Sequence, residues 1–537
     1  MNKIIMAKSY IIDILLCTVT GLLTAFAFPK INFYPLIWIS FLPIISVIMS
    51  NNPKKAFFYG FYSGFIFNML ELYWITLVLK TQLAYIYSIL MSSILWSYLA
   101  LYWGIWSIII SFFKEKIKYK LLLIIFGSCV WILLEYIRTY FLTGFSWGLI
   151  GYSQFKFIWL IQLVEFTGVY GISFLIILSN FILYFFLKKY IYFKLVYYKL
   201  FYYNFYTENN NYVYLNIINN KLKFSCFDLL HIFVILFFLI LMFGVIRYNK
   251  FNNLSINKQK YSVAIIQPNI SQQEKWNKNY INNILNIFKN YSYKINRKYD
   301  LILWPETAIP RLIFREQILF NTIKHITNIF GGINIIGSLY KNNDGNLFNV
   351  VIAFAKNKCL RKLHKKNHLV IFGEYVPLNF IFQKFFRLFN ISENFTAGTD
   401  SNIFNYNNLK IGSMICSENF TPIVCRKFIF SGAKVISNHT NDAWFFNTSA
   451  PYQHFIMNIF RAIEIRKTIL ISANSGISGI IDDKGNIIKK SKVLNKSLII
   501  GHFKQNNFNT FYAKHGDFFI FCCFLFIIIV SFFTLFQ

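Results

Sequence analysis

Long runs of nonpolar residues dominate the first half of the chain and recur at its end. Runs of this length are typical of helices that cross a lipid bilayer. Eight of them occur in the 537 residues, at 9–28, 33–50, 56–79, 82–112, 120–140, 158–186, 228–246 and 517–536. The pattern predicts a seven-helix membrane domain over 1–250, with a loop at 188–227, and a last membrane helix at 517–536.

Lysines gather in alternate loops between these runs. They are frequent before the first run, after the second and fourth, and in the loop 188–227, and they are sparse in the other loops. Basic loops stay in the cytoplasm. We therefore expect both termini in the cytoplasm and the region between the last two runs on the outer side of the membrane.

Between the last two membrane runs the pattern changes to short apolar segments separated by helical periodicity. The polar segment Arg247–Lys260 is interpreted as a linker. Strands are predicted at 261–268, 300–304, 333–339, 349–355, 409–416, 433–438 and 468–482, with helices near 276–291 and 451–467. Alternating strands and helices over 256–510 predict one α/β domain with its own core.

Composition and charge argue against several kinds of function. The net charge of +33 comes from lysines spread along the whole chain, without the basic stripe of a nucleic-acid-binding face, so no nucleic-acid partner is expected. The eight cysteines show no metal-binding spacing, and we expect no metal and no cofactor. Cys416 and Cys425 are the obvious pair for a disulfide, although the surroundings of Cys416 favour another role.

A glutamate follows one predicted strand of the outer domain. Glu306 comes after the run Leu301–Trp304 and is fixed by Pro305. Burial beside a tryptophan would raise the pKa of this carboxyl toward that of a general base. Taken alone, a solvated loop glutamate is the more common case.

A lysine and a cysteine lie beside apolar runs further along the chain. Lys366 precedes an apolar run that ends at Glu374, and a buried ammonium there would stabilise an oxyanion. Cys416 ends the strand 411–415, and a helix start at Thr421-Pro422 follows, so strand, turn and helix would expose the thiol and favour its thiolate. The ordinary alternatives are a surface lysine and a buried structural cysteine. Together the three residues predict a cysteine-nucleophile acyl-transfer or amide-cleaving site, and its attachment to a bilayer at both ends indicates a lipid acyl donor.

Longer motifs surround these positions. They are Gln267-Pro268-Asn269-Ile270, Lys275-Trp276, Trp304-Pro305-Glu306-Thr307-Ala308-Ile309-Pro310, Lys366-Asn367-His368-Leu369-Val370, Phe372-Gly373-Glu374-Tyr375-Val376-Pro377, Ile415-Cys416, Glu418, Thr440-Asn441-Asp442-Ala443-Trp444-Phe445, Gln453-His454, Gly144-Phe145-Ser146-Trp147, Gly151-Tyr152-Ser153-Gln154 and Gly168-Val169-Tyr170-Gly171. With them the chain resembles the apolipoprotein N-acyltransferases, membrane enzymes with an outer domain of the nitrilase (carbon–nitrogen hydrolase) superfamily. The resemblance implies a multi-pass helical membrane domain and an αββα sandwich.

The resemblance also implies a reaction. Glu306 would deprotonate Cys416, which would take an acyl chain from a phospholipid, typically phosphatidylethanolamine, as a thioester. Lys366 and the backbone N–H of Ser417 would stabilise the oxyanion. The acyl chain would pass to the α-amino group of an S-diacylglyceryl cysteine on an apolipoprotein. The implied setting is a monomer in the bacterial inner membrane with its catalytic domain on the periplasmic side.

Further residues receive supporting roles from the same resemblance. Glu374 and Glu418 would orient Lys366 and the catalytic carboxylate, with structural ion pairs as the alternative. Trp276 would line the acyl or head-group site or simply pack on a helix face. Trp147 and Tyr152, on an outer loop, would bind substrate or anchor the interface.

Three positions depart from the family pattern. Ser417 replaces a common tyrosine, Ile371 a proline, and Phe446 a glycine. Two other functions stay open: a membrane-tethered amidase or nitrilase that uses water as acceptor, and a scaffold with an inactive domain.

Overall fold

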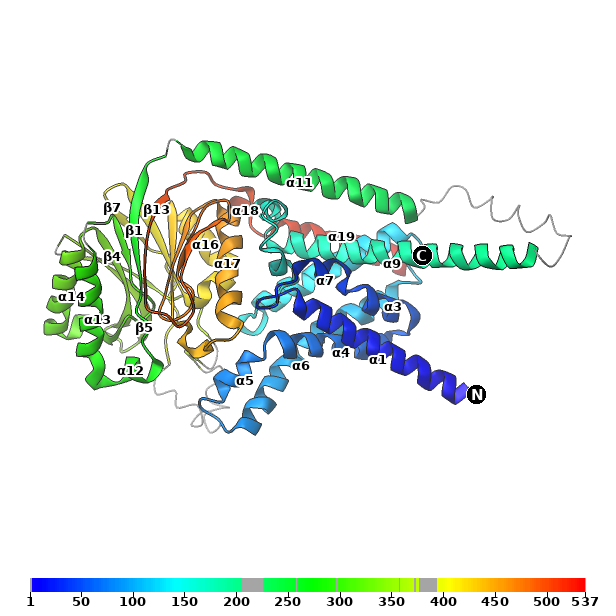
Figure 1. Cartoon of the computed structure of the whole chain (residues 1–537), viewed down its shortest axis with the longest axis horizontal. Coiled ribbons are helices and arrows are strands. Elements are labelled where there is room, and N and C mark those ends of the chain that lie inside the picture. The colour runs from blue at the N-terminus through cyan, green and yellow to red at the C-terminus, as the bar shows by residue number, and fades with distance from the viewer. Residues whose placement is uncertain are drawn as a thin grey trace.

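The computed structural model describes residues 2–204, 226–256, 258–295, 298–356, 358–370, 373–375 and 394–536. Figure 1 shows two parts side by side: a group of mostly long helices, and a domain of two stacked sheets whose helix α17 faces them. Ile371 and residues 205–225 of the predicted loop lie outside the described residues.

The helical part contains the predicted membrane segments. Its helices are α1 (Asn2–Phe26), α2 (Ile37–Ser40), α3 (Leu42–Ser50), α4 (Pro53–Glu71), α5 (Trp74–Leu79), α6 (Tyr85–Phe113), α7 (Lys120–Tyr140), α8 (Val164–Thr167), α9 (Val169–Asn204), α11 (Cys226–Ile256) and α19 (Phe518–Leu535), with 3-10 turns η1 (Tyr34–Leu36), η2 (Phe141–Thr143), η3 (Ile150–Gln154) and η4 (Leu160–Leu163). Among the described residues, five helices are long and apolar enough to cross a membrane, and two shorter apolar helices precede them. The multi-pass helical character is confirmed, and the number of eight spans stays a prediction.

Three predicted boundaries are wrong. The run 56–79 is broken at Leu72 and Tyr73, between α4 and α5. The run 158–186 is interrupted at Gly168, between the short helix α8 and the long helix α9, where φ is 63° and a Cβ would lie 2.8 Å from the Tyr512 ring. The expected linker 247–260 is helical up to Ile256, since α11 continues beyond its apolar part.

The second part is the α/β domain. Its strands are β1 (Lys260–Gln267), β2 (Leu301–Leu303), β3 (Ile309–Leu312), β4 (Ile333–Lys341), β5 (Leu347–Ala355), β6 (Lys358–Lys365), β7 (Ile403–Tyr406), β8 (Leu409–Ile415), β9 (Val435–Thr440), β10 (Ile469–Ala473), β11 (Gly479–Ile481), β12 (Ile487–Lys490) and β13 (Ser497–Lys504). Its helices are α12 (Gln272–Trp276), α13 (Ile281–Lys294), α14 (Gln317–Phe330), α16 (Pro422–Phe430), α17 (Ala450–Ile465) and α18 (Phe511–His515), with turns η5 (Lys278–Tyr280), η6 (Ile313–Arg315), η8 (Cys416–Phe420) and η9 (Asp442–Phe445). The predicted strand 468–482 is in fact two strands.

Within the described ranges, the strands form two sheets in the orders β13-β1-β2-β4-β5-β6 and β12-β11-β10-β9-β8-β7, with β3 paired to β4. The central strands β1, β2 and β4, and likewise β8, β9 and β10, are parallel. An apolar cluster fills the space between the sheets. Helices α13 and α14 cover the outer face of the first sheet, and α16 and α17 that of the second. This αββα sandwich is the predicted fold.

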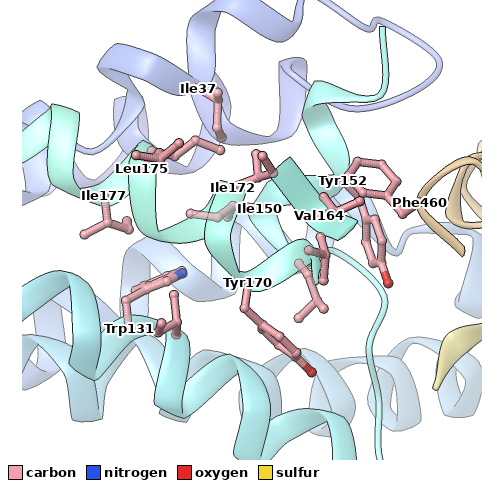
Figure 2. Close-up of a cluster of buried hydrophobic side chains, with 14 of the residues drawn as sticks. Ile37, Trp131, Ile150, Tyr152, Val164, Tyr170, Ile172, Leu175, Ile177 and Phe460 are labelled. Carbon is pink, nitrogen blue, oxygen red and sulfur yellow. The ribbon is translucent and has the colours of Figure 1, made fainter. Parts of the chain in front are cut away.

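Helix α17 joins the two parts. All its residues except Tyr452 are buried, because one side packs on its own sheet and the other on the membrane helices. Figure 2 shows Tyr152 of η3 against Phe460 of α17, with ring centroids 4.9 Å apart. The side chains of α17 and of the membrane helices belong to a single apolar core.

Candidate active site

Three strand ends bring the predicted catalytic residues together. Glu306 follows β2, Lys366 follows β6 and Cys416 follows β8. The turn at Glu306 lies directly on β4, where a Cβ on Gly337 would be 2.7 Å from the Glu306 Cα. Trp304 holds the same turn from the outer side by stacking on Phe288, with ring centroids 4.0 Å apart.

The Glu306 carboxylate is buried among polar partners. Its Oε1 accepts a hydrogen bond of 2.8 Å from Asn349 Nδ2 and lies 3.4 Å from Lys366 Nζ. Burial acts to raise the pKa of Glu306, but Lys366 and Lys275 outweigh it and hold this pKa below its usual value. The expectation of a raised pKa was therefore wrong, because it considered burial without the two cations. The residue is a carboxylate at neutral pH.

Lys366 is paired with two carboxylates. Its Nζ lies 2.9 Å from Glu374 as well as 3.4 Å from Glu306. Burial acts to lower the pKa of Lys366, but Glu374 and Glu306 raise it well above its usual value, so the side chain stays an ammonium. Asn349 Nδ2 also donates to Glu374 at 3.0 Å, and one amide thus bridges both carboxylates.

A second buried lysine was not among the predicted site residues. Lys275 of α12 is 3% exposed, and its Nζ donates to the main-chain oxygen of Glu306 at 2.8 Å. Burial lowers the pKa of Lys275 to about 7, against the opposing effect of Glu306 and Cys416. The only signal for it in the sequence was its place in the Lys275-Trp276 motif.

The nucleophile turn has an unusual backbone. Cys416 has a φ of 49°, a left-handed conformation that is uncommon for a residue with a side chain and often marks a functional site. Burial and the nearby Glu306 raise the pKa of the Cys416 thiol well above its usual value, with Lys366 opposing them. The resting side chain is a thiol, contrary to the expected thiolate, because the turn η8 separates Cys416 from the start of α16. Cys416 and Cys425 are both free, so the possible disulfide is absent.

Glu418 and Ser417 tie this turn to the segment after Lys366. Glu418 accepts hydrogen bonds from the backbone N–H of Ile415 at 2.7 Å and of Asn367 at 2.6 Å, and it pairs with His364 at 3.1 Å. The Ser417 hydroxyl donates to the His368 carbonyl oxygen at 3.0 Å. Glu374 contacts Lys366 itself, whereas Glu418 acts on the backbone of its neighbour.

The three predicted binding residues have different surroundings. Trp276 is 46% exposed and donates to Gln272 Oε1 at 3.1 Å, beside the buried Lys275. Trp147 is 3% exposed and packs on Phe420, with ring centroids 5.1 Å apart. Tyr152 is buried, and its hydroxyl accepts a hydrogen bond from Arg461. Trp147 and Tyr152 thus lie at the contact between the two parts of the molecule, and substrate binding by any of the three stays a prediction.

Known proteins match both parts of the chain. Residues 20–182 match the family described as apolipoprotein N-acyltransferase N-terminal domain, and residues 262–510 match the carbon–nitrogen hydrolase family. The apolipoprotein N-acyltransferase of Geobacter metallireducens is 30% identical over 520 residues, which cover 95% of this chain and 93% of that protein. This chain belongs to the apolipoprotein N-acyltransferase family.

Other similarities cover the same regions. Apolipoprotein N-acyltransferase 1 of Treponema denticola is 28% identical over 96% of this chain and 94% of its own length. A similar solved structure is that of Saccharomyces cerevisiae Nit3, a member of branch 10 of the nitrilase superfamily, with 17% identity, a TM-score of 0.37, and coverage of 46% of this chain and 90% of that chain. The family resemblance seen in the motifs is confirmed, and we interpret the function of this chain as that of an apolipoprotein N-acyltransferase family member.

Proposed function

We propose that this chain is an apolipoprotein N-acyltransferase that moves an acyl chain from a phospholipid to lipoproteins through a thioester on Cys416. Family membership over nearly the whole chain supports the activity. The observation that carries the residue assignment is the meeting of Glu306, Lys366 and Cys416 at three strand ends, with Lys366 Nζ 3.4 Å from the Glu306 carboxylate.

In the first half-reaction, Glu306 takes the proton of the nearby Cys416 thiol, which itself contributes to the lowered pKa of the Glu306 carboxyl. The thiolate attacks the carbonyl carbon of the phospholipid sn-1 ester, and the electron pair of the carbonyl bond moves to oxygen. The Lys366 ammonium and the backbone N–H of Ser417 stabilise this oxyanion. The ester C–O bond then breaks, the departing lysophospholipid oxygen takes the proton from Glu306, and the acyl chain remains on sulfur.

In the second half-reaction, the α-amino group of an S-diacylglyceryl cysteine attacks the thioester. Glu306 accepts a proton from the attacking nitrogen, the C–S bond breaks, and Glu306 returns the proton to the departing sulfur, which restores the thiol. The two pKa shifts set the starting state, in which Glu306 is ionised and Cys416 is protonated, and Lys366 favours the thiolate because it opposes the rise in the pKa of Cys416. The result is ping-pong acyl transfer.

The setting of the reaction is also part of the proposal. We assign phosphatidylethanolamine as the donor and the bacterial inner membrane as the location. The alternation of lysine-rich and lysine-poor loops supports a catalytic domain on the periplasmic side. Glu306, Lys366 and Cys416 meet within one chain, so the proposed reaction needs no second copy, and we assign a monomer.

Intact-protein mass spectrometry after incubation with phosphatidylethanolamine tests the proposal. Wild type should gain the mass of one acyl chain, and hydroxylamine or a diacylglyceryl-cysteine peptide should remove it. Cys416→Ser should gain no hydroxylamine-sensitive mass.

Free fatty acid without peptide acylation would instead favour a membrane-tethered hydrolase. A thioester that still forms in Cys416→Ser would contradict the assignment of the nucleophile.

A further inference from the structure

A buried histidine lies between the nucleophile turn and the membrane part. His454 of α17 is 1% exposed. Its Nδ1 is 2.8 Å from Asp442 Oδ1, and its Nε2 is 3.1 Å from Asn419 Oδ1 and 3.3 Å from the Cys416 carbonyl oxygen. One ring nitrogen, one Asp442 oxygen and the Cys416 Sγ all lie within 4.8 Å of one another.

Both ring nitrogens of His454 face hydrogen-bond acceptors. Asp442 offers a carboxylate, and the Cys416 carbonyl oxygen can only accept. The orientation of Asn419 is fixed because its Nδ2 donates to the His454 carbonyl oxygen at 3.1 Å, which leaves its Oδ1 toward the ring. A neutral imidazole carries one N–H and would leave one nitrogen lone pair against an acceptor. The ring therefore carries two protons and is an imidazolium.

The His454 cation and the Asp442 carboxylate have opposite charges, so together they form a nearly neutral pair beside the Cys416 thiol. Asp442 of η9 faces one side of the ring, Cys416 of η8 the other, and Glu306 lies further away. From the membrane side the uncharged Trp147 covers the ring, and Phe420 packs beside it, with centroids 6.1 and 5.2 Å from that of His454.

We propose that His454 is a positioning residue of the acyl-transfer reaction: its imidazolium holds the main chain of Cys416 in the left-handed conformation and cancels the negative charge of Asp442 beside the thiolate. The inference rests on the proposed function, in which Cys416 is the nucleophile. Without the cation, Asp442 would oppose ionisation of the thiol at close range.

The membrane part fixes the position of this histidine. The neighbouring Gln453 donates to Glu71 Oε1 at 2.7 Å and accepts from Trp74 Nε1 at 3.1 Å. These bonds join α17 to the break between α4 and α5, and Trp147 packs on His454 itself. Burial acts to lower the pKa of His454, but Asp442 outweighs it and raises this pKa above its usual value, which agrees with the hydrogen-bond argument for a cation.

The test measures alkylation of Cys416 by iodoacetamide as a function of pH, read on the Cys416 peptide by mass spectrometry in the detergent-purified full chain. In His454→Gln, Asp442 is left uncompensated, so the rate at pH 7.5 should fall about tenfold and the profile should move to higher pH. Adding Asp442→Asn removes the carboxylate and should restore the wild-type profile. A role in folding alone predicts that the double variant is as impaired as the single one.

His439→Gln is the matched control. His439 is equally buried, but burial lowers its pKa to about 4, so it is neutral and its loss removes no charge. Its profile should coincide with that of wild type.

Asp442→Asn alone keeps the proposal testable if His454→Gln does not fold. If His454 is charged because of Asp442, this substitution removes the charges of both residues, and the pH profile of Cys416 alkylation should barely move. A tenfold faster alkylation in Asp442→Asn would mean that His454 was already neutral, and it would overturn the proposal. A wild-type profile in folded His454→Gln would do the same. Alkylation needs no lipid, so these outcomes are independent of whether the acyl-enzyme forms.

Discussion

Two buried clusters in this molecule each place two cations around a glutamate, yet they differ in which cations they use. In the active site, Lys366 Nζ lies 3.4 Å from the Glu306 carboxylate, and Lys275 Nζ donates to the Glu306 main-chain oxygen at 2.8 Å. At the contact with the membrane part, Glu165 lies between Arg466, at 2.6 Å, and Arg247 of α11, at 2.5 Å.

The difference follows from the chemistry of the two side chains. Arginine stays charged, and its planar group makes several directed bonds. Arg466 also reaches Gln162 at 2.7 Å and the Asp483 carbonyl oxygen at 3.1 Å. A buried lysine can lose its proton, as the pKa of about 7 for Lys275 indicates. Arginines thus suit the permanent contact between the two parts that Glu165, Arg247 and Arg466 make, which we call the joint. Lysines suit a site whose groups gain and lose protons during a reaction.

The largest expected effect is on the active-site cluster. Lys366→Met removes the ammonium that we propose stabilises the oxyanion, and acyl-enzyme formation should slow by about 10²–10³-fold. Lys366→Arg should not restore the rate, because the planar guanidinium directs its N–H groups differently from the Lys366 ammonium. Mass-spectrometric time courses measure this. Lys365→Met is the control, since the Lys365 ammonium lies over Phe348 at 4.2 Å and not in the cluster. A normal rate in Lys366→Met would remove Lys366 from the mechanism.

Substitutions in the joint should lower the stability of the protein. Glu165→Gln leaves Arg466 buried without its carboxylate, which should lower the free energy of unfolding by about 3 kcal/mol. Thermal unfolding in detergent measures this, and acyl transfer well below the transition should persist. Gln162→Glu is the contrasting variant, because it adds a carboxylate next to Arg466 and should not destabilise as strongly. Loss of activity in folded Glu165→Gln would contradict the division between joint and site.

Lys275 should give the wild type a pH-dependent stability. Its pKa falls from 10.5 to about 7 on folding, so between these values the unfolded chain binds more protons than the folded one. The free energy of unfolding then rises with pH across this window, by at most about 1.4 kcal/mol per pH unit from this group. Lys275→Met should lack that rise, and the exposed Lys278→Met should keep it. Unfolding curves at pH 7 and pH 9 test this, and parallel pH dependence in Lys275→Met and wild type would count against a buried, proton-poor Lys275.

The smallest effect concerns Phe446, at the position where the family usually has glycine. Its φ of 51° and ψ of −152° belong to a region that is nearly exclusive to glycine. Phe446→Gly should raise the free energy of unfolding by about 1 kcal/mol, and Phe446→Ala should not, because alanine keeps the strain. Thermal unfolding compares the two, and equal effects would mean that the aromatic side chain matters more than the backbone.

The sequence predicted the parts of the fold whose residues are uniformly apolar. The central strands β1, β4 and β8 were found because both faces of each are buried. The strands β3, β6, β7, β12 and β13 were missed. Among them β6 and β12 are rich in lysine, and β12 is exposed at every residue. The polar end of α11 was taken for a linker for the same reason: its helical state comes from continuation of the preceding turns and not from an apolar face.

In the active site, too, the sequence identified some of the residues and missed others. Glu306 and Cys416 were proposed from their places after apolar runs, Lys366 from its place before one, and all three from the motifs around them. Lys275 was not, because a lysine in a lysine-rich chain gives no sign of burial, and its position depends on a short helix held by the Ser271–Glu274 capping box. The direction of the Glu306 pKa also depends on two cations distant in sequence, which local context does not contain.

Because the outer helix layer of the second sheet and the membrane helices belong to one apolar core, the catalytic half is not a soluble enzyme that happens to be tethered. A fragment limited to 258–510 would present the nonpolar side of α17 to water and would lose the partners of Gln453 and Arg466. Such a surface promotes self-association. The catalytic domain thus depends on the membrane helices to bury its own outer helix layer, and we expect a truncated catalytic domain to self-associate.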